Sequence, residues 1–342
     1  MASVFVRAND AAVTESRTAY AGSVQIGRGA IADVAADSRT IVVANPGDES
    51  VTVVRPDTVA APAVVDVAGE PTAIALAEDR AYVITSAAEV DTVVVVDTRA
   101  NAVVASYPLA FTATAIEVSR DGKRAYVART GNDHVDVAVI DTTAERVGTI
   151  DIPAGIGASI DGLRMSASGR ELYAAVTTIT GSRLLTIDTE TATVRKSLSI
   201  GAPIRDLALT KTAAYVLTSD LSSLGAIVVV DLAAFTVTGT VAAGALPIQM
   251  ALSADGSRAY VVDYDQVAVL CTVTNDVLET ITVGSRPTAL ALSGQGDRLY
   301  VADVDGRITA FRVTPPAPMY SPFGAVALAD AREARQLESV GV

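Results

Sequence analysis

The most regular feature of this chain is a succession of short apolar runs separated by polar and turn-forming residues. The clearest group of runs is PTAIALA (71–77), RAYVITS (80–86), DTVVVVD (91–97) and AVVASYPL (102–109). Each run has the length of a strand and is rich in β-branched residues, whose stiff side chains fit a pleated surface better than a helix. The pattern therefore predicts four successive antiparallel strands, which we name A, B, C and D.

This group of four strands recurs along the chain. An aromatic residue in strand B marks most copies, and successive markers lie about 40 to 47 residues apart, the length of a four-stranded propeller blade. The markers are Tyr82, Tyr126, Tyr173, Tyr215, Tyr260 and Tyr300, with Ile41 at the corresponding position of a less regular first copy. Seven copies predict an all-β fold, a seven-bladed β-propeller.

Polar residues between the runs predict how the strands are joined. Asp255-Gly256 and Asp121-Gly122 suit a tight turn between strands A and B, because glycine tolerates a positive φ. In four copies strand C ends in an aspartate, whose short carboxylate can accept hydrogen bonds from the backbone of the next turn. These residues are Asp97, Asp141, Asp188 and Asp231. We interpret them as structural.

The two ends of the repeat region predict how the ring closes. The last copy has only three strands, because its strand C, RITAFRV (307–313), is followed by TPPAP, and proline cannot continue a central strand. The segment AYAGSVQIG (19–27) precedes the first A strand and resembles a D strand. We expect it to complete the seventh blade and close the ring, so that the propeller domain spans residues 1–313.

Residues 314–342 have a different composition. A proline-rich spacer precedes residues that favour a helix, from about Gly324 to Glu338. This segment is expected to form a short helix packed on the propeller or a docking tail. In the second case Met319, Tyr320 and Phe323 would anchor a partner.

Composition excludes several classes of function. No apolar run approaches the roughly 20 residues of a membrane helix, so no membrane insertion is expected. The formal charge of −13 disfavours binding to nucleic acid. The single cysteine, Cys271, precludes an internal disulfide, and the start of the chain lacks the apolar core of a secretory signal. These features favour a cytoplasmic protein, with an exported protein whose signal was removed as the alternative. The oligomeric state stays open.

The sequence offers little for catalysis. A nucleophilic serine or cysteine needs a base, and the one histidine, His134, lies in a predicted loop with no GxSxG motif in the chain. Zinc, copper or haem sites need several His or Cys ligands. We therefore predict no catalytic residue, no metal and no cofactor.

Candidate binding residues lie in the loops that join strand B to C and strand D to the next A, which emerge on one face of the ring. Those at the D-to-A joins, around the mouth of the channel, are Arg28, Glu70, Arg205, Asp206, Gln249 and Arg286. Those in the B-to-C loops are Asp133, His134, Asp263, Asp265, Asp303 and Asp305. Three interpretations are open: a solvated acidic rim, a protein-binding face, or a lactonase-like or calcium-binding channel mouth.

The elements RAYV, RLYVAD and VVVVD resemble the YVTN-type repeats of bacterial seven-bladed β-propellers over about residues 19–313, although the Asn of that motif is mostly absent. The Ala and Val bias suits a GC-rich bacterium, and a seven-bladed chain of this kind with no predicted secretory signal is similar to the mycobacterial propellers that accompany an exporter of mycolate glycolipids. The resemblance implies a partner in a membrane transport complex. Together with the missing catalytic groups, it favours a non-catalytic interaction scaffold that binds another protein. A lactonase-like hydrolase or small-ligand binder is the alternative.

Overall fold

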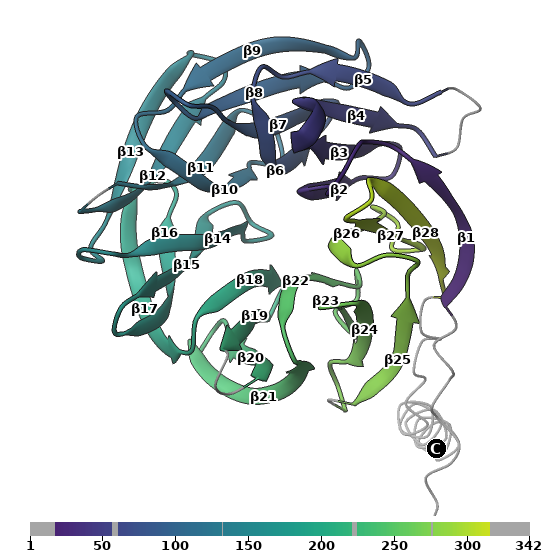
Figure 1. Cartoon of the computed structure of the whole chain (residues 1–342). Helices are drawn as coiled ribbons and strands as arrows, with labels where there is room; N and C mark the ends of the chain where they lie inside the picture. The colour runs from purple at the N-terminus through teal and green to yellow at the C-terminus, as the bar shows by residue number, and fades with distance from the viewer. Residues whose placement is uncertain (1–17, 57–60, 132, 221–223, 275, 315–342) are drawn as a thin grey trace, which may run out of the picture.

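Short strands joined by tight turns build a ring of blades around a central channel (Figure 1). The computed structural model describes residues 18–56, 61–131, 133–220, 224–274 and 276–314. These residues form seven four-stranded antiparallel sheets, and their one helical element is the 3-10 turn η1 (Pro46–Asp48). The seven-bladed propeller predicted from the sequence is confirmed.

In each blade the four strands run in order from the channel outwards. Blade 1 contains β2 (Asp33–Ala36), β3 (Ile41–Asn45), β4 (Ser50–Val54) and β5 (Ala63–Asp66); blade 2 contains β6 (Glu70–Ala77), β7 (Arg80–Ser86), β8 (Thr92–Asp97) and β9 (Ala102–Pro108). Blade 3 contains β10 (Thr112–Val118), β11 (Arg124–Thr130), β12 (Val135–Asp141) and β13 (Arg146–Ile152); blade 4 contains β14 (Ser159–Met165), β15 (Glu171–Thr178), β16 (Gly181–Asp188) and β17 (Thr193–Gly201). Blade 5 contains β18 (Ile204–Leu209), β19 (Ala213–Asp220), β20 (Leu224–Asp231) and β21 (Thr236–Gly244); blade 6 contains β22 (Pro247–Leu252), β23 (Arg258–Asp263), β24 (Gln266–Cys271) and β25 (Val277–Thr282). Blade 7 contains β26 (Pro287–Leu292), β27 (Arg298–Asp303), β28 (Arg307–Val313) and β1 (Thr18–Gln25).

The hydrophobic core lies between the blades. Each of the seven clusters of buried apolar side chains joins two neighbouring sheets; in one of them Tyr126 and Val137 of blade 3 pack with Ile160 and Leu172 of blade 4. Successive residues of a strand point to opposite faces, so the two middle strands of a blade bury both faces and are apolar throughout. This explains runs such as VVVV at 93–96.

The marker tyrosines of strand B face the following blade. Tyr82, for example, is fully buried and donates a hydrogen bond to the carbonyl of Gly122 in blade 3 (2.6 Å). In blade 1 this position belongs to Val42, which packs against blade 2, whereas Ile41 faces blade 7. The register expected for the first copy was therefore one residue out, because a strand of period two turns every side chain over when it shifts by one.

The repeated polar residues are confirmed as turn elements. Gly122 and Gly256 adopt φ of 64° and 70°, a region that a side chain disfavours. The Asp188 carboxylate accepts hydrogen bonds from the N–H groups of Glu190 (3.0 Å) and Thr191 (2.8 Å), and Asp97, Asp141 and Asp231 form corresponding bonds. Each such aspartate pins a turn between strands C and D.

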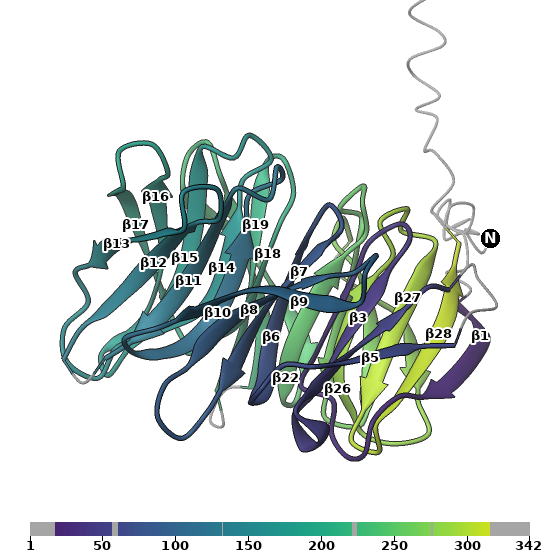
Figure 2. The same ribbon diagram turned by 90° about the horizontal axis from the view of Figure 1, so that it is seen from above.

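The strands end at two faces that differ in their connections (Figure 2). We name the face with the B-to-C and D-to-A connections the loop face, and the face with the A-to-B and C-to-D turns the turn face. The turn face repeats similar turn residues in several blades, whereas the connections of the loop face differ in length and composition. Loops positioned by a rigid scaffold are where binding residues are usually found.

The N-terminal strand closes the ring. β1 pairs with β28 from Thr18 opposite Val313 to Gln25 opposite Arg307, and the ring of Tyr20 meets that of Phe311 edge to face at 6.3 Å. The predicted closure by residues 19–27 is thus confirmed. The described residues end at Thr314, so the predicted helix or docking tail at 315–342, with Met319, Tyr320 and Phe323, lies outside them.

Closure by β1 can be tested by truncation. Removal of residues 1–25 takes away β1 and leaves the edge of β28 unpaired, so we expect the midpoint of thermal unfolding to fall by about 5 to 10 °C and aggregation to rise. Removal of residues 1–17 keeps β1 and should change the midpoint by less than about 2 °C. Equal midpoints for the two truncated chains would contradict a closing role for β1. Circular dichroism with light scattering measures both effects.

Candidate functional site: the channel and the loop face

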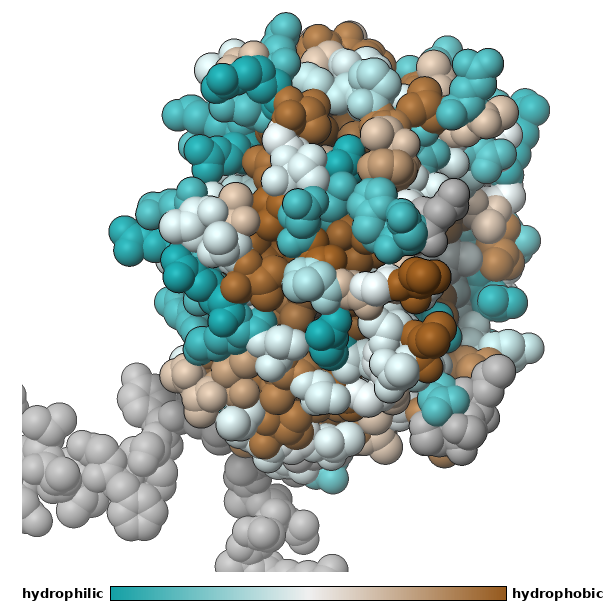
Figure 3. Space-filling model, turned by 90° about the vertical axis from the view of Figure 1, so that its left-hand side faces the viewer, coloured by the Kyte–Doolittle hydropathy of each residue, from teal (hydrophilic) through white to brown (hydrophobic). Residues whose placement is uncertain are grey.

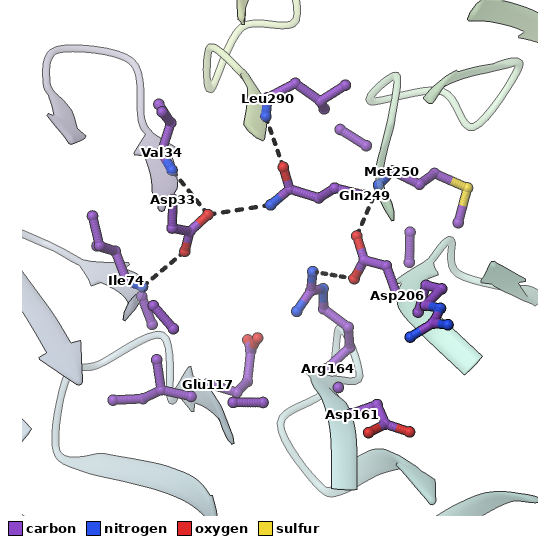
Figure 4. A pocket seen from close by; sticks show the side chains of 18 of the residues that line it. Asp33, Val34, Ile74, Glu117, Asp161, Arg164, Asp206, Gln249, Met250 and Leu290 are labelled. Carbon is purple, nitrogen blue, oxygen red and sulfur yellow. Dashed lines mark hydrogen bonds and ion pairs between the residues drawn. The ribbon is translucent and has the colours of Figure 1, made fainter. Parts of the chain in front are cut away.

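The innermost strands of the seven blades line a central cavity of about 600 Å³. Most of the side chains that they turn into it are small, such as Ala75 and Ala251. Larger polar side chains that line it come from five blades and include Asp33 from β2, Glu117 from β10, Arg164 from β14, Asp206 from β18 and Gln249 from β22 (Figure 4). The charged side of the channel is therefore built by residues far apart in the sequence.

Three of these side chains join neighbouring blades. In each case an oxygen on one blade accepts a hydrogen bond from a backbone N–H of the next blade. The pairs are Asp33 with Ile74 (2.8 Å), Asp206 with Met250 (2.8 Å) and Gln249 with Leu290 (2.7 Å). The Gln249 amide also donates to Asp33 (3.2 Å), which links the first blade to the sixth across the channel.

Arg164 lies among these carboxylates, and Arg205 is the other cation among the described residues that line the cavity. The Arg164 guanidinium donates to Asp206 (3.0 Å) and to the carbonyl of Leu163 (2.8 Å). Burial disfavours charge on the carboxyls around it, so the pKa of Asp33 is raised to about 6 and that of Glu117 to about 7, although the charge of Arg164 and backbone N–H groups partly oppose this. The Glu117 carboxyl points into the open part of the cavity (Figure 4). The channel can therefore take up protons close to neutral pH.

The residues predicted at the channel mouth are divided between two places. Asp206, Gln249 and Arg205 line the channel cavity. Arg28, Glu70 and Arg286 are exposed on the loop face and do not line this cavity; the Arg286 guanidinium lies 5.6 Å from the ring centre of Tyr264. The structure thus gathers half of the set, and the arrangement does not form the single convergent pocket expected of a lactonase-like mouth.

The aspartates of the B-to-C loops also differ among themselves. Asp263 and Asp303 are buried and accept hydrogen bonds from backbone N–H groups, those of Ala245 and Leu246 for Asp263 and those of Asp305 and Arg307 for Asp303. Asp265 and Asp305 are exposed. Asp263 and Asp303 therefore order the loops, and Asp265 and Asp305 face solvent.

Asp133 and His134 border a second cavity, of about 410 Å³, between blades 2 and 3 on the loop face. The His134 Nδ1 atom lies 2.8 Å from Asp133, and its ring meets the ring of Phe111 edge to face at 4.7 Å. Beneath them Arg129 is buried in a two-pronged ion pair with Asp136 (2.7 and 2.8 Å). No hydroxyl or thiol is among the hydrogen-bond partners of His134 within the described residues, so the geometry supplies no nucleophile and base pair.

No three carboxylate, histidine or cysteine side chains within 18–314, apart from the short gaps, are arranged to hold a metal ion. The described segments also contain no helix long and apolar enough to cross a membrane.

Sequence reasoning missed Asp33, Glu117 and Arg164. A signal was present, because Glu117 and Arg164 occupy a position of strand A that holds alanine in the other five copies: Ala35, Ala75, Ala208, Ala251 and Ala291. Because the repeated fold accepts alanine at this position, a charged residue there indicates a role other than building the blade.

The raised pKa of Glu117 predicts a pH-dependent stability. Its pKa in the folded chain lies above that of the unfolded chain, so the folded chain holds the proton between about pH 4.5 and 7, and stability is lost as the pH rises through this window. The Glu117→Gln substitution removes the titrating carboxyl, and with it this loss of stability at higher pH. Relative to the wild type, the variant should gain about 1 to 3 kcal/mol between pH 5 and pH 8.

Denaturant unfolding across this pH range measures the difference in unfolding free energy. Glu190→Gln, at an exposed position on the turn face, serves as the control and should follow the wild-type curve. A Glu117→Gln curve parallel to the wild type would show that the carboxyl titrates normally.

No model of a known protein family matches the chain. Two solved propellers share the fold: a chain of Kuenenia stuttgartiensis hydrazine synthase, with a TM-score of 0.75 and 18% identity over 92% of this chain and 100% of that one, and the WD40 β-propeller domain of Doa1, with a TM-score of 0.70 and 12% identity over 86% and 97%. At this identity they show the fold alone.

Two mycobacterial proteins are similar in sequence. A seven-bladed β-propeller protein of Mycolicibacterium smegmatis is 51% identical over 259 residues, which cover 75% of this chain and 70% of the relative. A seven-bladed β-propeller protein of Mycobacterium tuberculosis is 32% identical over 282 residues, 72% of each chain. Neither has an enzymatic name. On the sequence identity, the coverage and the shared architecture, this chain belongs to the family of mycobacterial seven-bladed β-propeller proteins.

Proposed function

We propose that this chain is a non-catalytic platform that binds another protein through its loop face. The observation that carries the proposal is where large apolar side chains are exposed. Apart from those on the outer strands, they gather on the loop face: Val90, Phe111, Ile156, Ile179, Leu224, Leu246, Ile248 and Tyr264. Among the described residues of the turn face, only Val273 belongs to this class.

The outer strands offer a less suitable surface. Their exposed apolar residues, such as Val104 of β9 and Val147 of β13, are distributed over the outer strands of several blades. Figure 3, which views the side of the ring where β13 and β17 lie, shows hydrophobic patches interrupted by hydrophilic side chains. Scattered apolar residues of this kind are normal on a protein surface.

Two isoleucines are the most exposed apolar residues of the loop face. Ile156, in the connection from blade 3 to blade 4, is 77% exposed, and Ile179, in the B-to-C loop of blade 4, is 88% exposed. They border a hollow of about 630 Å³. Burial of such side chains by a partner is favourable, and the rigid ring lets the loops bind with little ordering cost.

Within this proposal, the partner is a membrane transport complex approached from the cytoplasm. The family resemblance favours such a complex, and the chemistry of the loop face is compatible with it. Cytoplasmic loops of membrane proteins are enriched in Lys and Arg, and they would meet a face that carries many carboxylates. Residues 315–342 would add a second contact through Met319, Tyr320 and Phe323.

The platform proposal predicts a loss of partner on substitution of the loop face. In the full chain, Ile156→Asp with Ile179→Asp should lower the yield of a specific co-purified partner from mycobacterial cells by at least about 10-fold, because it places charges in an apolar contact. The yield is measured by quantitative mass spectrometry after cross-linking in the cell. Both positions are exposed, so the thermal unfolding midpoint should stay within about 2 °C of the wild type.

The matched control is Val104→Asp with Val147→Asp on the outer strands, which should retain the partner. Equal recovery with the loop-face and outer-strand variants would refute a role for the loop face. Loss of the partner only on removal of residues 315–342 would assign binding to the tail instead.

A further inference from the structure

The two faces of the ring differ in charge. On the loop face nine described carboxylates are exposed, and they are accompanied by only four exposed cations, Arg28, Arg205, Arg286 and Arg307. The carboxylates are Asp48, Glu49, Asp66, Glu70, Glu89, Asp133, Asp151, Asp265 and Asp305. We name this set the acidic rim.

The turn face has the opposite balance. Its exposed cations outnumber its exposed carboxylates in the described residues and include Arg80, Arg120 and Lys211. Many of its acids are also compensated: Asp97, Asp141 and Asp188 accept hydrogen bonds from turn N–H groups, which hold the pKa of each below its usual range. The excess of exposed negative charge is therefore concentrated on the loop face.

Ion pairs follow the same division. At the turn end of the blades, Asp79 pairs with both Arg39 (3.4 Å) and Arg99 (2.6 Å), and Asp188 pairs with Arg195 (3.0 Å). For the acidic rim, the described residues give one contact at ion-pair distance, that of Asp133 with His134, which is an ion pair only when His134 is protonated. Like charges that crowd one face repel each other, and a cationic partner relieves this repulsion.

The cavity between blades 2 and 3 combines this charge with an apolar wall. Leu109, Phe111 and Val90 line it, and Glu89 and Asp133 stand exposed at its border. A lysine or arginine side chain has a matching form, with an apolar stem and a charged end. Arg129 beneath the cavity does not oppose such a ligand, because Asp136 neutralises it.

We propose that the partner surface is a basic amphipathic segment, and that it inserts a lysine or arginine side chain into the cavity between blades 2 and 3. This inference rests on the proposed function, since it names the chemistry of the protein that the loop face binds. The apolar residues Ile156 and Ile179 bury the apolar side of the segment, and the acidic rim receives its cations.

A peptide probe tests the chemistry without knowledge of the natural partner. The full chain is titrated into a fluorescent amphipathic peptide of about 14 residues made of Lys and Leu, and into the same peptide with Glu in place of Lys. Anisotropy should show binding of the Lys peptide at least about 10-fold tighter than that of the Glu peptide at 0.1 M salt. The preference should shrink at about 0.5 M salt, because salt screens the attraction.

Two double variants with the same change in net charge locate the site. Glu89→Gln with Asp133→Asn removes two carboxylates from the cavity and should weaken binding of the Lys peptide by at least about 5-fold. Glu145→Gln with Asp276→Asn removes two exposed carboxylates from the turn face and should weaken it by less than about 2-fold.

Three outcomes would overturn the inference: no preference for the Lys peptide, equal weakening by both double variants, or no effect of either. The first would exclude a basic segment, the second would reduce the attraction to overall net charge, and the third would show that the carboxylates of the cavity do not contribute to binding. The proposed function fails separately, through the Ile156 and Ile179 variants and the cellular partner. If the Ile156 and Ile179 variants lose the cellular partner but the chain does not prefer the Lys peptide, the proposed platform function stands. The inference of a basic partner is then refuted.

Discussion

Packing of each blade against the next is the interaction on which this fold depends. No blade has a core of its own, because every apolar cluster is shared by two neighbouring sheets, including the junction of blade 7 with blade 1. A fully buried aliphatic side chain contributes about 1.5 to 3 kcal/mol, so an unpaired blade would expose a large unfavourable surface on either side. The ring must therefore close, and β1 closes it by pairing the start of the chain with β28, near its end.

Closure also decides what the channel can contain. The inner strands approach one another around a single axis, and five of the seven blades carry alanine at the strand A position that holds Glu117 and Arg164 in the other two. Asp33, Asp206 and Gln249 join neighbouring blades around the channel through backbone N–H groups. Burial raises the pKa of Glu117, although Arg164 and the backbone N–H of Met165 partly oppose this shift. Its charge is held beside Arg164 at some cost to stability at neutral pH.

The two faces of the ring meet different demands. On the turn face the same problem, a tight reversal between neighbouring strands, is solved several times with the same residues, such as Asp-Gly between strands A and B. On the loop face the connections have few backbone constraints in common, so their side chains are available for other purposes. Exposed isoleucines and exposed acids accumulate there, and both favour contact with an apolar and cationic partner.

The sequence by itself determined the number of blades, the strands of each blade, the turn residues and the closing strand. These are local features, and seven repetitions make a weak local signal strong. The register predicted for the first copy was wrong by one residue at Ile41, because no tyrosine marks the position there. Only the tertiary structure decided which polar residues meet. Asp33, Glu117 and Arg164 are far apart in the chain and share the channel because the ring brings the innermost strands together. The tertiary structure also gives Asp263 and Asp265, which are two residues apart, different environments. Asp263 is a buried hydrogen-bond acceptor and Asp265 is exposed. A repeat specifies the geometry that its copies share, but the environment of a residue that differs between copies depends on contacts with other blades, which local sequence does not encode.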